Sequence, residues 1–188
     1  MLNGLLGSFS TGVAPVTTSY VSIQTATVTS GGTSTITFSS IPSDYTHLQL
    51  RILARNTYGA GSDGDYIKVQ FNSDTGSNYV EHQLGGNGSS ASASAFTSQT
   101  ATFLQRLAAT GLSSSIFGAT VTEILEYKNT NKYKTLRTLD GVDYNGGGSI
   151  YLTSGLWMST SAITSITLNA GSGTGFEQYS TFALYGVK

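Results

Sequence analysis

The sequence predicts an all-β protein, an antiparallel β-sandwich that is jelly-roll-like and contains about ten strands. Two observations carry this prediction. The 188 residues include 27 serines, 27 threonines, 23 glycines and 11 tyrosines, and Thr and Tyr favour strands whereas Gly and Ser favour turns. Short segments of alternating apolar and polar residues are also separated by turn signals at near-regular spacing, whereas continuous runs of good helix formers are scarce.

The stretch 41–54, IPSDYTHLQLRILA, organises the predicted fold. It opens with Pro42, Ser43 and Asp44, which favour a turn because proline fixes φ and lacks an N–H while Ser and Asp bond their own backbone. Alternation follows, with one face carrying Leu48, Leu50, Ile52 and Ala54 and the other carrying His47, Gln49, Arg51 and Leu53. This pattern predicts a central strand with one face in the core.

The other elements follow in chain order. Before the central strand, 20–28 and 33–39 predict two strands joined by a turn at 30–32, and after it 66–71, YIKVQF, predicts another. Residues 79–84 fit a short strand or a single helical turn, and 85–94, GGNGSSASAS, predict a surface loop because they offer little apolar area to bury.

The second half of the chain also predicts strands separated by turns and loops. Strands are predicted at 97–107, at 116–127 (with a helix from Val121 as the alternative), and at 132–139, where the hairpin should expose a face rich in Lys, Arg and Glu. Residues 140–149, DGVDYNGGGS, predict a loop. The remaining strands are predicted at 150–156, 163–168 and 179–187.

The predicted boundaries give one domain, 20–188, preceded by an arm, 1–19. The arm carries the apolar residues Leu2, Leu5, Leu6 and Phe9 among Gly, Ser and Thr. It is either an unordered terminus or a segment that attaches to a neighbouring subunit, because an exposed apolar arm is otherwise costly.

Composition argues against several functional classes. Nine Lys plus Arg stand against ten Asp plus Glu, so the basic excess typical of a nucleic-acid-binding protein is missing. Without cysteine the chain has no disulfides and no thiolate metal sites. No segment has the apolar length of a membrane helix, and the N-terminal residues lack the basic region of a secretory signal.

Candidate catalytic groups are few, and we expect no enzyme. The histidines His47 and His82 are expected to be surface or interface side chains, since no nucleophile motif accompanies them. Two carboxylate pairs are conceivable in a glycosidase, Glu123 with Glu126 and Asp140 with Asp143. The first pair should point to opposite faces of a strand, and the second should flank a turn, where Asp serves the backbone.

Binding groups are similarly sparse, and no cofactor is predicted. Asp63, Asp65, Asn72 and Asp74 could offer oxygens to calcium, but the EF-hand pattern is missing. Candidate aromatics for a ligand or an interface are Tyr58, Tyr144 and Trp157, of which Trp157, at the mouth of a predicted loop, is the first to test.

Several stretches together resemble a family of small tailed-phage virion proteins found in marine and cyanobacterial phages. They are FSSIPSDYTHLQLRILAR, FNSDTGSNY, LEYKNTNKYKTLRTLDG, SIYLTSGLWMSTSAITSITLNAGSG and the ending FEQYSTFALYGVK. The resemblance covers about residues 20–188. It implies a non-enzymatic β-sandwich on the outside of a phage particle, assembled in the host cytoplasm, with no catalytic residues to transfer.

We therefore expect a capsid decoration or cement protein that binds the major capsid protein or another virion protein through its N-terminal arm. A homo-oligomer is expected, with a trimer favoured, because a symmetric assembly covers open strand edges. The alternative is a tail fibre or receptor-binding module that recognises a host surface glycan through its aromatic residues and Gly/Ser loops.

Overall fold

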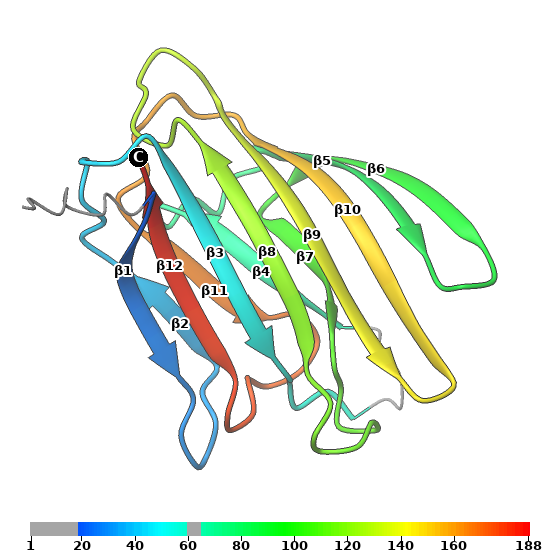
Figure 1. Ribbon diagram of the computed structural model, residues 1–188. Coiled ribbons are helices and arrows are strands. Elements are labelled where there is room, and N and C mark those ends of the chain that lie inside the picture. The colour runs from blue at the N-terminus through cyan, green and yellow to red at the C-terminus, as the bar shows by residue number, and fades with distance from the viewer. Residues whose placement is uncertain (1–18, 60–64) are drawn as a thin grey trace, which may run out of the picture.

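The computed structural model describes residues 19–59 and 65–188 and contains twelve β-strands and no helix in those ranges. The strands form two layers, visible in Figure 1. An eight-stranded sheet, here the large sheet, has the order β1-β12-β3-β8-β9-β10-β5-β6, and a four-stranded small sheet has the order β2-β11-β4-β7. Every pairing between neighbouring strands is antiparallel, so the predicted antiparallel β-sandwich is confirmed.

The large sheet contains the strands β1 (Tyr20–Thr27), β12 (Thr181–Val187), β3 (His47–Ala54), β8 (Gly118–Leu125), β9 (Lys134–Tyr144), β10 (Gly147–Trp157), β5 (Tyr79–Gly86) and β6 (Ala91–Gln99). The small sheet contains β2 (Thr35–Phe38), β11 (Ile166–Ala170), β4 (Asp65–Phe71) and β7 (Thr102–Leu107). The central strand predicted from 41–54 is β3, which lies between β12 and β8.

The core lies between the two sheets and is built by the alternation read from the sequence. Leu48, Leu50 and Ile52 of β3 point inward and are buried. Facing them, Ile67, Val69 and Phe71 of β4 and the apolar residues of β11 come from the small sheet. Because each strand turns every second side chain to this layer, the sandwich is closed by period-two patterning.

Two predicted loops are in fact strands. Residues 85–94 form the ends of β5 and β6 with a turn at 87–90, and the backbone N–H of Asn87 donates to Ser90 O at 3.2 Å. Residues 140–149 continue β9 and begin β10, which leaves a turn of only two residues, Asn145 and Gly146. Glycine and serine favour turns on their own, but here backbone pairing with a neighbouring strand holds them in strands.

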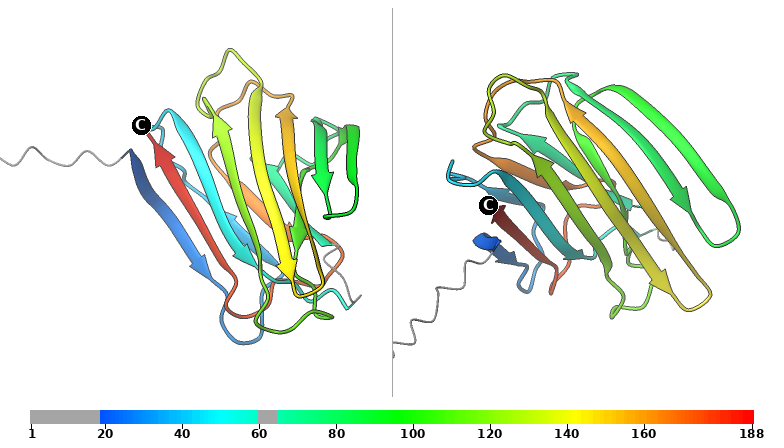
Figure 2. Two further views of the ribbon diagram at one scale, coloured as in Figure 1. Left: turned by 45° about the vertical axis from the view of Figure 1, so that its right-hand side comes forward. Right: turned by 45° about the horizontal axis from the view of Figure 1, so that its top comes forward.

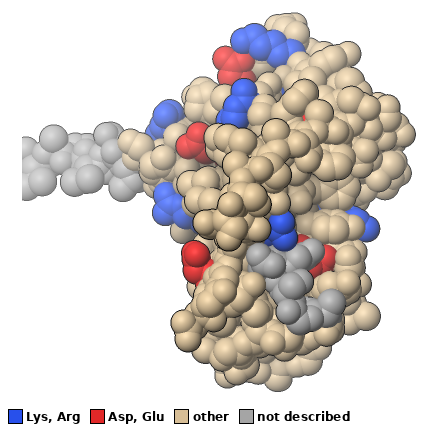
Figure 3. All heavy atoms as spheres, turned by 90° about the vertical axis from the view of Figure 1, so that its right-hand side faces the viewer, with Lys and Arg blue, Asp and Glu red and all other residues tan. Residues whose placement is uncertain are grey.

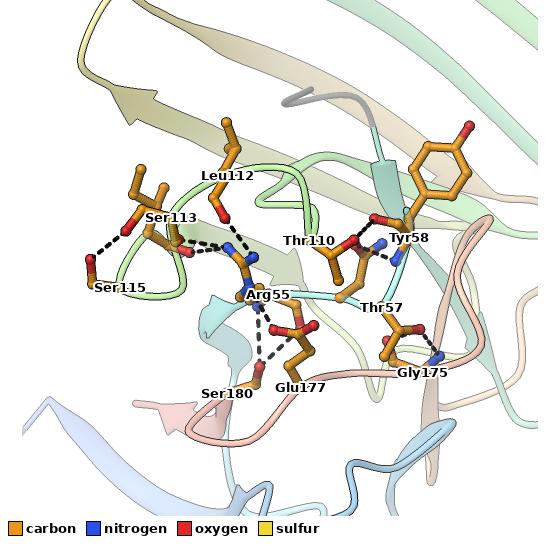
Figure 4. Close-up of polar contacts among 12 residues, drawn as sticks. Arg55, Thr57, Tyr58, Thr110, Leu112, Ser113, Ser115, Gly175, Glu177 and Ser180 are labelled. Atoms are coloured by element: carbon orange, nitrogen blue, oxygen red, sulfur yellow. Dashed lines mark hydrogen bonds and ion pairs between the residues drawn. The ribbon is translucent and has the colours of Figure 1, made fainter. Parts of the chain in front are cut away.

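A buried arginine fastens the loops at one end of the sandwich, as Figure 4 shows. Arg55, at the end of β3, is 3% exposed and pairs with Glu177 at 2.6 Å. Its guanidinium also donates to the carbonyl oxygens of Leu112, Ser113 and Ile116. A planar fork with several donors can serve all four acceptors, so the loop before β8 and the loop before β12 are held together.

Candidate functional site

The outward face of the large sheet carries an apolar patch. It consists of Leu53, Leu84, Val121, Leu139, Ile150 and Leu152, and each of these side chains is between 41% and 56% exposed. We call this set the outer patch. Scattered exposed apolar residues are ordinary, but contiguous ones indicate a contact surface.

Strand register shows that the outer patch is contiguous. One row of directly paired residues runs across the sheet through Val121, Leu139, Leu152 and Leu84, continuing to Ala93 at the edge. Paired residues on one face have Cβ atoms about 5 Å apart, so these side chains touch or nearly touch.

A second row lies two residues further along the strands. It joins Leu53 through Ala119 and Gly141 to Ile150. From a strand spacing of about 4.8 Å and a row spacing of about 7 Å, the two rows cover on the order of 300 Å². That area is comparable to the largest apolar patches of monomeric proteins, which are often functional. Shallow hollows lie over the patch, one of them lined by Leu84, Leu139, Ile150 and Leu152.

The third row is polar and borders the outer patch. It contains Gln49, Glu123, Arg137, Ser154 and His82 in register across the same strands. Gln49 donates to Glu123 at 3.4 Å. One acid and one base on neighbouring strands give this border no net charge, which suits a polar rim around an apolar centre.

The predicted Lys, Arg and Glu face of the β8–β9 hairpin is only partly correct, because Glu123 and Arg137 are exposed there but share the face with apolar residues. Val121, Leu125 and Leu139 point outward, whereas Thr120, Thr122 and Thr138 are buried. Lys134 is also buried, and its Nζ donates to the carbonyl oxygens of Lys132 and Thr160. Desolvation lowers the pKa of Lys134 below its ordinary value.

The inward face of β8, β9, β10 and β5 carries a polar layer among its core residues, on the side that packs against β7. Thr122 and Thr138 share a hydrogen bond of 2.9 Å in this layer. Two buried carboxylates also lie here, Glu81 of β5 and Asp140 of β9. Burial raises the pKa of Glu81 and raises that of Asp140 to about 7.

The two buried carboxylates bond to the backbone of β7. Glu81 Oε1 accepts the N–H of Phe103 at 2.5 Å, and Asp140 Oδ2 accepts the N–H of Gln105 at 3.0 Å. Strand β7 is the edge of the small sheet, so its alternate N–H groups would otherwise lack partners. The carboxylates thus stand in for a neighbouring strand, which is a structural use of buried acids. Asp140 lies within β9 and not beside a turn, contrary to the sequence prediction.

The remaining candidate catalytic residues are dispersed. Glu123 is exposed on the outward face, whereas Glu126 pairs with Lys132 at the end of β8. His82 is exposed on the outward face of β5, and His47 Nδ1 accepts the backbone N–H of Glu126. In the described part of the chain, no group of three or more His, Asp or Glu is placed to hold a metal ion.

The predicted calcium oxygens serve other roles or lie outside the described residues. Asp65 is buried and contacts Asn56 and the backbone N–H of Ser172. Asp74 accepts a hydrogen bond from Trp157 at 2.7 Å, and this bond contributes to the lowered pKa of Asp74, against the opposing effect of desolvation. Asp63 is not among the described residues.

The predicted aromatic residues are not brought together. Trp157 is 2% exposed, stacks on Tyr79 in the core and has no surface for a ligand. Tyr144 is half-buried at the opposite end of the β9–β10 hairpin. Tyr58 is half-buried in the loop after β3, and its ring points away from the contacts drawn in Figure 4.

The proposed attachment residues Leu2, Leu5, Leu6 and Phe9 lie outside the described residues. Sequence reasoning missed the outer patch, because each strand was assigned an inward apolar face in isolation. Leu84, Leu139 and Leu152 alternate with polar neighbours as core residues would, and only the strand register shows which way they point.

A search for similar proteins found no matching family model, no matching curated protein and no matching solved structure. Among the described residues no helix is long and apolar enough to cross a membrane.

Proposed function

We propose that this chain is a non-enzymatic structural protein on the exterior of a tailed-phage particle, a capsid decoration or cement protein. The observation that carries the proposal is the outer patch, which offers a flat apolar surface to another protein. That this assembly is a phage particle is inferred from the sequence resemblance. The N-terminal arm is the segment that we propose attaches to the shell.

The size of the outward face fits such a contact. Five strands of about eight residues span roughly 24 by 26 Å, so a partner would bury about 600 Å² on each side, near 1,200 Å² in total, the lower end of specific interfaces. Burial of about 300 Å² of patch would contribute roughly 7 kcal/mol before the costs of association. The polar border opposes Glu123 to Arg137, and the exposed Arg51, paired with Val121, adds one positive charge beside the patch.

Gold-labelled antibody raised against this chain tests the proposal on intact particles of the phage that encodes it. We expect label over the head. Label confined to the tail would favour the receptor-binding alternative, and unlabelled particles would refute a location on the virion exterior.

One observation favours that alternative, recognition of a host surface glycan. A hollow of about 280 Å³ lies between the turns of the β5–β6 and β9–β10 hairpins, lined by Asn87, Asp143, Ser149 and several glycines. Asparagine, aspartate and backbone groups suit sugar hydroxyls. Binding of the purified chain to host surface polysaccharide, lost in Asp143→Ala, would support this function; no binding at millimolar sugar would argue against it.

A further inference from the structure

Strand β6 is an open edge of the large sheet. It pairs with β5 on one side and is the last strand in the sheet order. All of its residues from Ala91 to Ser98 are exposed. In Figures 1 and 2 strand β6 projects beyond the small sheet, and no described residue buries either face of it from Ala91 to Ser98.

This edge lacks two features that commonly protect the edge of a sheet, charged residues and proline. Strand β6 has nine residues, and no charged residue or proline occurs from Gln83 to Gln105. By contrast β2 has four residues and β7 is capped by Glu81 and Asp140. Both β1 and β6 carry a register shift, but that of β6 lies between Phe96 and Gln99 and leaves Ala91 to Ala95 regular. In Figure 3, which faces the β6 side, charged side chains are scattered among uncharged ones. A long, uncharged edge is a template for pairing with another strand.

The hairpin turn fixes which backbone groups of β6 face outward. Asn87 and Ser90 close the turn with a backbone hydrogen bond. Hydrogen-bonded and non-hydrogen-bonded pairs alternate along an antiparallel ladder, so Ser92 and Ser94 bond to β5. The N–H and C=O groups of Ala91, Ala93 and Ala95 therefore point to the open edge.

We propose that two copies of this chain pair through β6, antiparallel about a two-fold axis at Ala93. In this register Ala93 faces Ala93 of the second copy, Ala91 faces Ala95, and Ser92 faces Ser94. Like residues then meet on both faces, and all three outward-facing alanines exchange backbone hydrogen bonds. Every side chain from Ala91 to Ala95 is small and uncharged, so none opposes the approach there, and the exposed ring of Phe96 lies just beyond this stretch.

The pairing also joins the two outer patches. Ala93 continues the row of Val121, Leu139, Leu152 and Leu84 to the edge. Two copies joined at Ala93 therefore form one sixteen-stranded sheet, eight strands from each, with an unbroken apolar row on one face.

This inference goes beyond the proposed function and does not depend on it. It predicts a dimer contact, whereas the sequence expectation was a trimer. Absence of the chain from particles would refute only the proposed function, and a monomeric or trimeric mass would refute only the pairing.

Sedimentation equilibrium of the full chain tests the pairing, with Ala93→Lys and Ala93→Glu as variants. The wild type should have twice the chain mass. Each variant alone should have a dimer dissociation constant at least about tenfold higher, because like charges meet at the axis. An equimolar mixture of the two variants should regain the dimer. Ala119→Lys, which adds the same charge on the same face away from the edge, should remain dimeric.

A cysteine scan tests the register, since the chain has no native cysteine. In an Ala93→Cys dimer the facing Cα atoms would be about 5.5 Å apart, within disulfide range. In Ala91→Cys they would be roughly 14 Å apart, which is too far. Mild oxidation should cross-link Ala93→Cys, and a mixture of Ala91→Cys with Ala95→Cys, but not Ala91→Cys alone. Equal cross-linking of Ala93→Cys and Ala91→Cys, a wild-type mass other than a dimer, or failure of the charged mixture to recover would overturn the proposal.

Discussion

Arg55 is a single residue on which two loops depend. Its buried guanidinium serves one carboxylate, that of the partly exposed Glu177, and three backbone carbonyl oxygens. Removing the side chain would leave these partly buried acceptors without their donor, and an unpaired acceptor that water reaches only in part costs free energy.

We expect Arg55→Met to lower the free energy of unfolding by about 2–4 kcal/mol, because the partly exposed Glu177 can recover some hydration. Arg55→Lys should cost less, about 1–3 kcal/mol, because an ammonium keeps the charge but cannot reach all the carbonyl oxygens. Urea unfolding measures both. Lys132→Met, which breaks the exposed pair with Glu126, is the matched control and should cost under about 1 kcal/mol. Equal losses for Arg55→Met and Lys132→Met would show that burial of the Arg55 pair is unimportant.

Asp140 should make stability depend on pH. Burial beneath β7 raises its pKa to about 7, and nearby Glu81 adds to the effect while Arg106 opposes it. The folded state then holds a proton that the unfolded state releases near pH 4. Stability from this group is fully present below about pH 4 and is lost as the pH rises to about 7, in total about 4 kcal/mol.

Asp140→Asn should flatten this decline between pH 4 and 7 while keeping an acceptor for the Gln105 N–H. Chemical unfolding at a series of pH values measures the free energy of unfolding of both proteins. Asp143→Asn, on the exposed face of the same strand, should keep the wild-type profile. A wild-type stability that rises over this interval would contradict the assignment.

At the scale of elements, the β5–β6 hairpin packs closely against β10 at Gly85, which lies against the ring of Tyr151. An added Cβ at Gly85 would lie 2.4 Å from the Tyr151 ring. That ring stacks on the Arg106 guanidinium at 4.5 Å and accepts its hydrogen bond at the hydroxyl. The glycine therefore allows the hairpin to approach β10 without disturbing this pair.

Gly85→Ala should destabilise the fold by about 1–3 kcal/mol, because the Tyr151 ring must move. Gly86→Ala is the matched control, since its nearest atom is 3.8 Å away, and it should cost under about 1 kcal/mol. Thermal unfolding compares the two. Indistinguishable midpoints would mean that Tyr151 moves at no cost.

The sequence predicted the buried face of β3 but not the buried faces of β8 to β10. The alternation in 41–54 predicted β3 and its buried face correctly, because period two is a local property. The same alternation could not orient β8 to β10, where threonines turn inward and Leu139 and Leu152 outward. Their orientation follows from packing against β7 and its capping carboxylates, which are contacts between residues distant in sequence.

The prediction of a loop at 85–94 was wrong for a related reason. Its glycines and serines carry no strand signal of their own, and their strand structure comes from pairing with β10 and with each other. Composition thus identified the fold class, whereas the extended sheet, the outer patch and the open edge at β6 required the register.

At the scale of the whole molecule, the two sheets differ in the surfaces that they expose. The small sheet closes the core and its β7 edge is capped, whereas the large sheet extends past it with an apolar outward face. A monomer in water would leave about 300 Å² of this patch exposed, and we propose that another protein covers it in an assembly.

Hydroxyl-radical footprinting of intact particles against the purified chain tests this account most directly. We expect oxidation of Leu139, Ile150 and Leu152 to fall several-fold in particles, because another protein covers the outer patch. Tyr133, exposed in the turn between β8 and β9, serves as the reference and should change little. Equal oxidation of the outer patch in both samples, or particles without this chain, would contradict the account.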